Sequence, residues 1–168
     1  LLDDYQESGY RLAICPGRLD HDIVAINRKY HLGITERISQ NGAVIYQGNQ
    51  LNAVLLDKQA AVKIYDLLTE YDVRVEMNTV SNRYWMSPRD PDFPKEFYDS
   101  SIIKEDFKDI IPYQPVVLYL VVGEEDYLKE IQTVIKKNFT QVDAILTSKT
   151  SLEIVPLHIS KGEAIRTM

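Results

Sequence analysis

The segment SLEIVPLHISKGE, residues 151–163, combines three local signals that together indicate an α/β fold. Residues 151–155 are rich in apolar and β-branched side chains, which is typical of a short buried strand. Lys161 then stands at the expected beginning of a helix. The segment therefore predicts a strand, a close turn and a helix whose first turn carries a lysine.

A second informative segment, RLAICPGR, lies far upstream at residues 11–18. Its apolar run Leu12–Cys15 suits a strand buried in a parallel sheet, and Pro16-Gly17 ends it with a loop. Arg18 lies in that loop, at the carboxyl end of the strand, where ligands bind in open α/β sheets. A helix is expected to begin at Asp20, so the chain opens as strand, loop and helix.

The third segment, ISQNGAVIY at residues 38–46, begins as the next strand of the same α/β arrangement. Asn41-Gly42 interrupts it, and glycine permits a backbone turn that other residues resist. After this turn the pattern of the sequence changes. We therefore expect the chain to leave the α/β domain at this point.

Residues 42–156 predict two β-α-β-β units. Each expected helix has apolar side chains on one face at the i, i+3, i+4, i+7 spacing of a helix that packs on a sheet. The expected strands are 43–47 and 51–56, 73–80 and 83–86, 116–122, 142–147 and 152–155, with helices beginning at Asp57 and Glu124. The module should therefore be a two-layer α+β domain.

Residues 88–115, between the two units, hold five of the seven prolines of the chain. Proline excludes long regular elements, although 101–111 could form one short helix. A long irregular segment inside a domain is usually a functional or accessory loop. The sequence leaves open whether this one is the edge of a lid that faces substrate or a plain surface insertion.

Composition excludes several classes of function. A net charge of −6 with dispersed lysines and arginines argues against a nucleic-acid surface. The longest apolar run, Val116–Val122, is far shorter than a membrane span, and no signal segment opens the chain, so no membrane association is expected. The single cysteine, Cys15, excludes an internal disulfide and is expected to be a buried strand residue. These features favour a cytoplasmic protein.

The order and spacing of the three segments resemble the haloacid dehalogenase superfamily, specifically its Cof-type phosphatases with a large α/β cap. The resemblance implies a partial Rossmann-like core interrupted by an α+β cap. Residues 1–41 would belong to the core, 42–156 would form the cap, and 157–168 would return to the core. The resemblance covers essentially the whole chain.

The resemblance also implies a function, the Mg²⁺-dependent hydrolysis of small phosphate monoesters such as sugar phosphates. The partner would be a small phosphorylated metabolite. In that family an opening Asp-x-Asp motif supplies the nucleophile, and a closing Gly-Asp-x-x-Asn-Asp motif helps to hold Mg²⁺. Both motifs are expected to lie outside residues 1–168, so no metal ligand is named here and these residues alone are expected to be inactive.

Five residues match the family's motifs and are the candidate site. Lys161 would steady the nucleophile and the transferring phosphoryl group; the alternative is a solvated lysine near a helix start. Gly17 and Arg18 would face substrate, although Arg18 could instead face the domain hinge or form a surface salt bridge. Asn41 and Gly42 would contact substrate or brace a hinge. All five assignments follow from the resemblance.

One position departs from the family's pattern. Pro16 stands where the family has a threonine or serine whose hydroxyl donates to the phosphoryl group, and proline has neither a hydroxyl nor an amide proton. This departure leaves a second interpretation, a non-enzymatic ferredoxin-like module that binds a small molecule or regulates. Weakened phosphate binding is expected in either case.

Overall fold

A computed structural model describes residues 2–89, 91 and 100–168. The chain divides into two compact units, the first formed by Leu1–Val54 with Ile159–Met168 and the second by Leu55–His158. Each unit contains one sheet. The first unit therefore combines both ends of the chain, with the second inserted between them.

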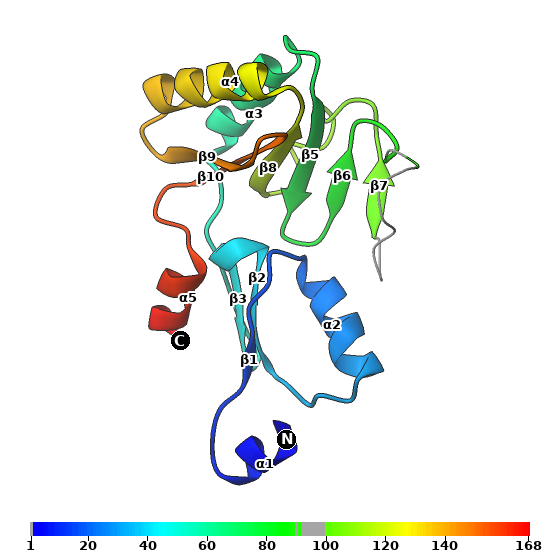
Figure 1. Cartoon of the computed structure of the whole chain (residues 1–168), viewed down its shortest axis with the longest axis vertical. Coiled ribbons are helices and arrows are strands. Elements are labelled where there is room, and N and C mark those ends of the chain that lie inside the picture. Colours follow the sequence, from blue (N-terminus) through cyan, green and yellow to red (C-terminus); the bar gives the residue numbers. More distant parts are fainter. Residues whose placement is uncertain (1, 90, 92–99) are drawn as a thin grey trace. The chain divides into compact units, whose positions relative to one another are not determined.

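The first unit contains a four-stranded sheet in the order β1-β2-β3-β4 (Figure 1). Its strands are β1 (Ala13–Ile14), β2 (Glu36–Ser39), β3 (Val44–Gln47) and β4 (Gln50–Ala53), and its helices are α1 (Leu2–Glu7), α2 (Asp20–Lys29), the 3₁₀ turn η1 (Gln40–Gly42) and α5 (Lys161–Thr167). β1 and β2 are parallel, whereas β3 pairs antiparallel with both of its neighbours, β2 and β4. The predicted strand, loop, helix and strand at the start of the chain are present.

Local chemistry explains why α2 forms where it does. Two aspartates, Asp20 and Asp22, lie in its first turn, and Arg28 and Lys29 lie in its last turn, as the helix dipole favours. Ile23 is fully buried, so the helix packs through an apolar side chain. This helix follows directly on the loop that carries the predicted site residue Arg18.

The second unit contains a six-stranded sheet in the order β7-β6-β5-β8-β10-β9. Its strands are β5 (Arg74–Thr79), β6 (Arg83–Trp85), β7 (Ser101–Ile103), β8 (Val116–Val122), β9 (Val142–Ser148) and β10 (Ser151–Pro156), and its helices are α3 (Lys58–Leu68) and α4 (Glu125–Asn138). Among its described strands, only the β6–β7 pair is parallel. Both helices lie on one face of this sheet (Figure 1).

The core of the second unit lies between the sheet and its two helices. Ile64 from α3 and Ile131 from α4 are fully buried against alternate residues of β5 and β8, such as Val75 and Tyr119. The Tyr119 hydroxyl donates a hydrogen bond of 2.9 Å to the carbonyl oxygen of Ala61, which satisfies its one polar atom in the core. The helical periodicity predicted this face correctly.

The two predicted β-α-β-β units differ in completeness. The second is present as β8, α4, β9 and β10, whereas the first lacks its opening strand in this sheet. The predicted strand 51–56 divides: β4 pairs with β3 in the first sheet, and only Leu56 reaches the second, donating to the Val116 carbonyl oxygen at 2.9 Å. The tight turn at Gly48-Asn49 folds β4 back onto β3, so the hairpin extends the first sheet. The hairpin therefore belongs to the first unit, although residues 42–156 were expected to form one domain.

The proline-rich segment 88–115 also differs from expectation where it is described. Ser101–Ile103 is a strand, β7, and not part of the helix expected at 101–111. It pairs with β6, so a long-range contact overrides the local helical pattern. Residues 90 and 92–99 of this segment lie outside the described residues.

In the part of the chain that the structure describes, no helix is both long enough and apolar enough to span a membrane.

Candidate functional site

The three sequence segments meet at one turn of the first unit, η1 at residues 40–42, which we call the 40–42 turn. β1 and β2 are parallel, with Ile14 opposite Arg37, so their carboxyl ends lie at the same edge of the sheet. The loop 15–18 follows β1, and the 40–42 turn follows β2. This is the edge at which open α/β sheets bind ligands.

The loop 15–18 is bound to the 40–42 turn through the backbone. The Gln40 N–H donates to the Arg18 carbonyl oxygen at 2.9 Å, and the Asn41 N–H donates to the Pro16 carbonyl oxygen at 3.4 Å. The Asn41 side chain lies over Gly17, because a Cβ added to Gly17 would be 2.9 Å from the Asn41 Oδ1. A side chain at position 17 would displace this amide.

The backbone of the 40–42 turn is strained. Gln40, Asn41 and Gly42 have φ angles of +50°, +58° and +104°, so three consecutive residues occupy the left-handed half of φ space. Non-glycine residues there cost about 1–3 kcal/mol each and persist where the surrounding structure holds them. Such strain clusters at functional sites, which is an independent reason to place the site here.

The segment with Lys161 packs against the same turn. A Cβ added to Gly42 would overlap the Ser160 carbonyl oxygen and would lie 2.7 Å from the Ser160 carbonyl carbon and 3.1 Å from the Lys161 nitrogen. Ser160 caps α5, since its Oγ accepts from the Glu163 N–H at 3.0 Å. Glycine at position 42 therefore serves both the turn and this close approach.

The charge of Lys161 acts on the loop after β1. Burial raises the pKa of the Cys15 thiol, and the positive charge of Lys161 opposes that rise. The Lys161 ammonium therefore lies within electrostatic range of loop 15–18.

Cys15 is half-buried in this loop, beyond the end of β1, so the expectation of a buried strand cysteine was wrong. The strand is shorter than the apolar run because Pro16 follows so closely.

All five predicted site residues lie in the first unit, on the three segments that meet at the 40–42 turn. Lys161 and Gly17 are exposed, and Arg18 and Asn41 are half-buried. The residue that the sequence did not reveal is Gln40, which is buried and has a left-handed backbone. No local signal marks it, because glutamine is not among the residues enriched at positive φ.

The chemistry of this group suits an anion better than a metal. It presents an ammonium, a guanidinium and an amide, whereas Mg²⁺ prefers carboxylate and water oxygens. Across residues 2–89, 91 and 100–168, no three His, Cys, Asp or Glu side chains are grouped so that they could hold a metal ion. The described residues therefore do not fit a magnesium site.

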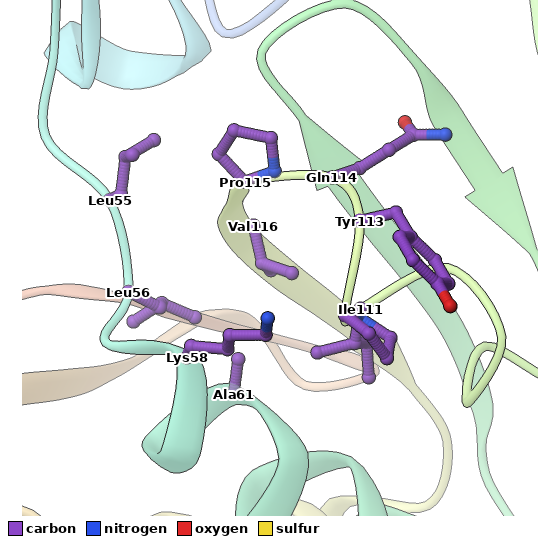
Figure 2. A pocket seen from close by; sticks show the side chains of 10 residues that line it. Leu55, Leu56, Lys58, Ala61, Ile111, Tyr113, Gln114, Pro115 and Val116 are labelled. Atoms are coloured by element: carbon purple, nitrogen blue, oxygen red, sulfur yellow. The ribbon is translucent and has the colours of Figure 1, made fainter.

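The second unit has a largely apolar pocket of about 290 Å³ where the chain enters α3. Figure 2 shows aliphatic side chains and the Pro115 ring around it, with the Lys58 side chain directed toward its interior. Leu56 and Val116 form part of its wall. The Tyr113 hydroxyl and the Gln114 amide are the other polar groups of a lining that is mostly apolar, which offers little for a small charged substrate.

Solved structures that resemble this chain share its fold at low sequence identity. A haloacid dehalogenase-like hydrolase from B. subtilis is 17% identical with a TM-score of 0.81, and the match covers 99% of this chain and 68% of that one. A protein from Thermotoga maritima is 17% identical with a TM-score of 0.80, and here the match covers 99% and 64%. A sugar phosphatase of haloacid dehalogenase subclass IIB is 15% identical with a TM-score of 0.73, covering 98% and 64%. At this identity the likeness concerns the fold.

This chain spans 64% of the length of the Thermotoga maritima protein. Comparison with curated proteins gives no match. The family comparison, by contrast, matches residues 1–168, the whole of the chain. The chain belongs to the haloacid dehalogenase-like hydrolase family.

Proposed function

We propose that the complete protein is a Cof-type phosphatase that hydrolyses small phosphate monoesters, such as sugar phosphates, with Mg²⁺. The 40–42 turn and the two segments packed on it would hold the phosphoryl group. The observation that carries the proposal is the approach of Gly42 to the Ser160–Lys161 backbone, which brings a lysine from the end of the chain to the loop edge of the sheet. A subclass IIB sugar phosphatase has the same fold.

The proposed role of Lys161 follows from its charge. Phosphoryl transfer depends on positioned positive charge, because negative charge is spread over the phosphoryl oxygens. An ammonium on a flexible stem can follow those oxygens through the reaction. Arg18, in the loop bound to the same turn, would add a second cation toward the substrate.

Mg²⁺ enters the proposal through the family alone. When bound, it would offset charge on the phosphoryl oxygens. The described residues do not provide ligands for Mg²⁺, so the proposal assigns no metal-binding role to any of them. Loss of activity on addition of EDTA to the complete protein, with recovery on addition of Mg²⁺, would test this part.

The decisive experiment compares the complete protein with its Lys161→Ala variant on generic phosphate esters and sugar phosphates. We expect kcat/KM to fall by about 100-fold or more, because removal of one charged transition-state contact costs about 2.7–4 kcal/mol. Lys137→Ala is the matched control, since Lys137 is an exposed lysine of α4 in the other unit. Equal loss in both variants, or no loss in either, would contradict the assignment of Lys161.

A second candidate function rests on Pro16. Its carbonyl oxygen accepts from the Asn41 N–H, while its ring provides no donor for a phosphoryl oxygen. This favours a protein that binds a phosphorylated ligand without hydrolysing it. Binding of a sugar phosphate to the complete protein, with no release of phosphate in the presence of Mg²⁺, would support this alternative over the phosphatase.

A further inference from the structure

The pocket where the chain enters α3 lies entirely within the second unit, and we call it the Lys58 pocket. Its lining comes from two segments, residues 55–61 at the start of α3 and residues 111–116 at the start of β8. None of the five residues assigned to the phosphatase proposal belongs to this lining. A ligand of this pocket would therefore be separate from the phosphoryl group held at the 40–42 turn.

The walls of the Lys58 pocket are held by hydrogen bonds. The Leu56 N–H donates to the Val116 carbonyl oxygen at 2.9 Å, which joins the entry to α3 to the first residue of β8. In the other wall, the Gln114 Nε2 donates to the Tyr84 hydroxyl at 2.7 Å, and the Gln114 Oε1 accepts from the Asn82 Nδ2 at 3.1 Å. Walls that are already in place reduce the ordering cost of binding a ligand.

Lys58 is the charged group of this pocket. It is the first residue of α3, where the helix dipole disfavours a cation, and its side chain is directed toward the interior of the pocket (Figure 2). The neighbouring carboxylate of Asp57 instead accepts from the N–H groups of Gln59 and Ala60 at 3.0 Å. Across residues 2–89, 91 and 100–168, no carboxylate forms an ion pair with Lys58. The ammonium is therefore available to a negatively charged ligand.

The rest of the lining favours an apolar ligand body. Leu56, Ala61, Ile111 and Val116 are almost fully buried and give the pocket an aliphatic interior. Its volume is about 290 Å³. An enclosed apolar cavity of about 150 Å³ binds one benzene ring, so this pocket has room for a ring with a short chain.

Two apolar side chains of the lining are left in contact with water. Leu55 is 40% exposed and Tyr113 is 86% exposed. A ligand with an apolar body would cover part of this surface, and removal of apolar surface from water favours binding. A mostly apolar lining with one well-placed charged group is typical of sites for small organic molecules.

The single ammonium limits the charge of the ligand. It can balance one carboxylate, whereas a phosphate monoester carries almost two negative charges at neutral pH. The second charge would lose its hydration among aliphatic side chains without gaining a partner. We infer that the Lys58 pocket binds a small arylalkanoate, a monocarboxylate with an apolar ring, with its carboxylate at Lys58 and its ring against the aliphatic interior.

This site goes beyond the proposed phosphatase activity, and binding tests it without any turnover. The complete protein is titrated with 3-phenylpropionate by isothermal titration calorimetry. Three comparison ligands change one feature each, since 3-phenylpropionamide lacks the charge, acetate lacks the apolar body and benzylmalonate carries a second carboxylate. We expect 3-phenylpropionate to bind about tenfold more tightly than each of them, because each lacks one contact or adds one unpaired charge.

Variants assign the binding to this pocket. Lys58→Met keeps the apolar stem and removes the charge, so affinity for 3-phenylpropionate should fall about tenfold while affinity for the amide stays unchanged. Leu55→Ala should weaken the acid and the amide alike, by about threefold. Lys63→Met is the matched control, since Lys63 is an exposed lysine of the same helix outside the lining. Lys161→Ala should bind the acid with unchanged affinity, so failure of the phosphatase proposal leaves this result intact.

The inference is overturned if 3-phenylpropionate shows no saturable binding at millimolar concentrations, or if 3-phenylpropionamide binds as tightly as the acid. It is equally overturned if Lys58→Met keeps the preference for the acid, or if Lys63→Met or Lys161→Ala loses it. Should Lys58→Met lose its far-ultraviolet circular dichroism, Lys58→Gln takes its place with the same expected loss.

Discussion

Replacement of Gly42 by alanine tests the geometry on which the candidate site depends. Two costs add at this position. The φ of +104° is unfavourable for a residue with a Cβ, by about 1–2 kcal/mol. The new methyl group would also overlap the Ser160 carbonyl and approach the Lys161 nitrogen at 3.1 Å, and such overpacking costs about 1–3 kcal/mol. We therefore expect Gly42→Ala to lower the free energy of unfolding by about 2–5 kcal/mol.

Gly48→Ala is the matched control for this experiment. Gly48 also has a positive φ, +59°, but a Cβ added there would meet nothing within 4 Å. Only the backbone cost of about 1–2 kcal/mol should remain. The assay is urea unfolding of the 168-residue chain followed by circular dichroism, with the midpoint and slope measured for each variant.

The difference between the two variants isolates the contact with Ser160 and Lys161. We expect Gly42→Ala to be less stable than Gly48→Ala by about 1–3 kcal/mol. Equal stabilities would mean that the Lys161 segment does not pack against the 40–42 turn, and the proposed convergence of the three segments would be refuted.

Further predictions concern the loop, the core and the reaction. In the complete protein, Pro16→Thr should raise kcat/KM by about tenfold or more, because it restores a donor to the phosphoryl oxygen. An unchanged kcat/KM would mean that the missing donor at position 16 does not limit the reaction. Ile131→Ala should destabilise the chain by about 2–5 kcal/mol in urea unfolding, since Ile131 is fully buried. Burial raises the pKa of the Tyr119 phenol above that in the unfolded chain, so stability should be fully present below about pH 10 and fall as pH rises above it. Tyr119→Phe should make that fall shallower, which unfolding curves at pH 9–11 would measure. The 168-residue chain alone should hydrolyse no phosphate ester, and Mg²⁺-dependent turnover by it would contradict the absence of a metal-binding group among the described residues.

The best-predicted elements are those whose signals are local. Asp57 was expected to begin a helix, and its carboxylate accepts from the Gln59 and Ala60 N–H groups at 3.0 Å as the N-cap of α3. β8 has the predicted bounds, Val116–Val122, because an uninterrupted apolar run suits a strand near the middle of a sheet. α4 begins one residue later than predicted, since Glu124 is its N-cap.

The elements that differed depend on partners distant in sequence. β7 is a strand because it pairs with β6, although its own residues lie in a proline-rich segment. β4 joins the first sheet because the turn at Gly48-Asn49 returns it to β3. In both cases the pairing partner, and not the propensity of the segment, decided the outcome.

The candidate site divides in the same way. Residue types and their order placed Gly17, Arg18, Asn41, Gly42 and Lys161 on three segments, and the family match covers all of them. Their convergence and the strained backbone of Gln40 follow from contacts between residues that are far apart in the chain.

By itself, then, the sequence determined the helices with apolar stripes and caps, the central strand β8 and the identity of the motif residues, because each of these depends on neighbours within a few positions. Tertiary structure alone decided which sheet received β4, how closely Gly42 approaches Ser160, and which side chains surround Lys58. These features require strand register and backbone contact across long sequence separations, which local side-chain preferences do not specify.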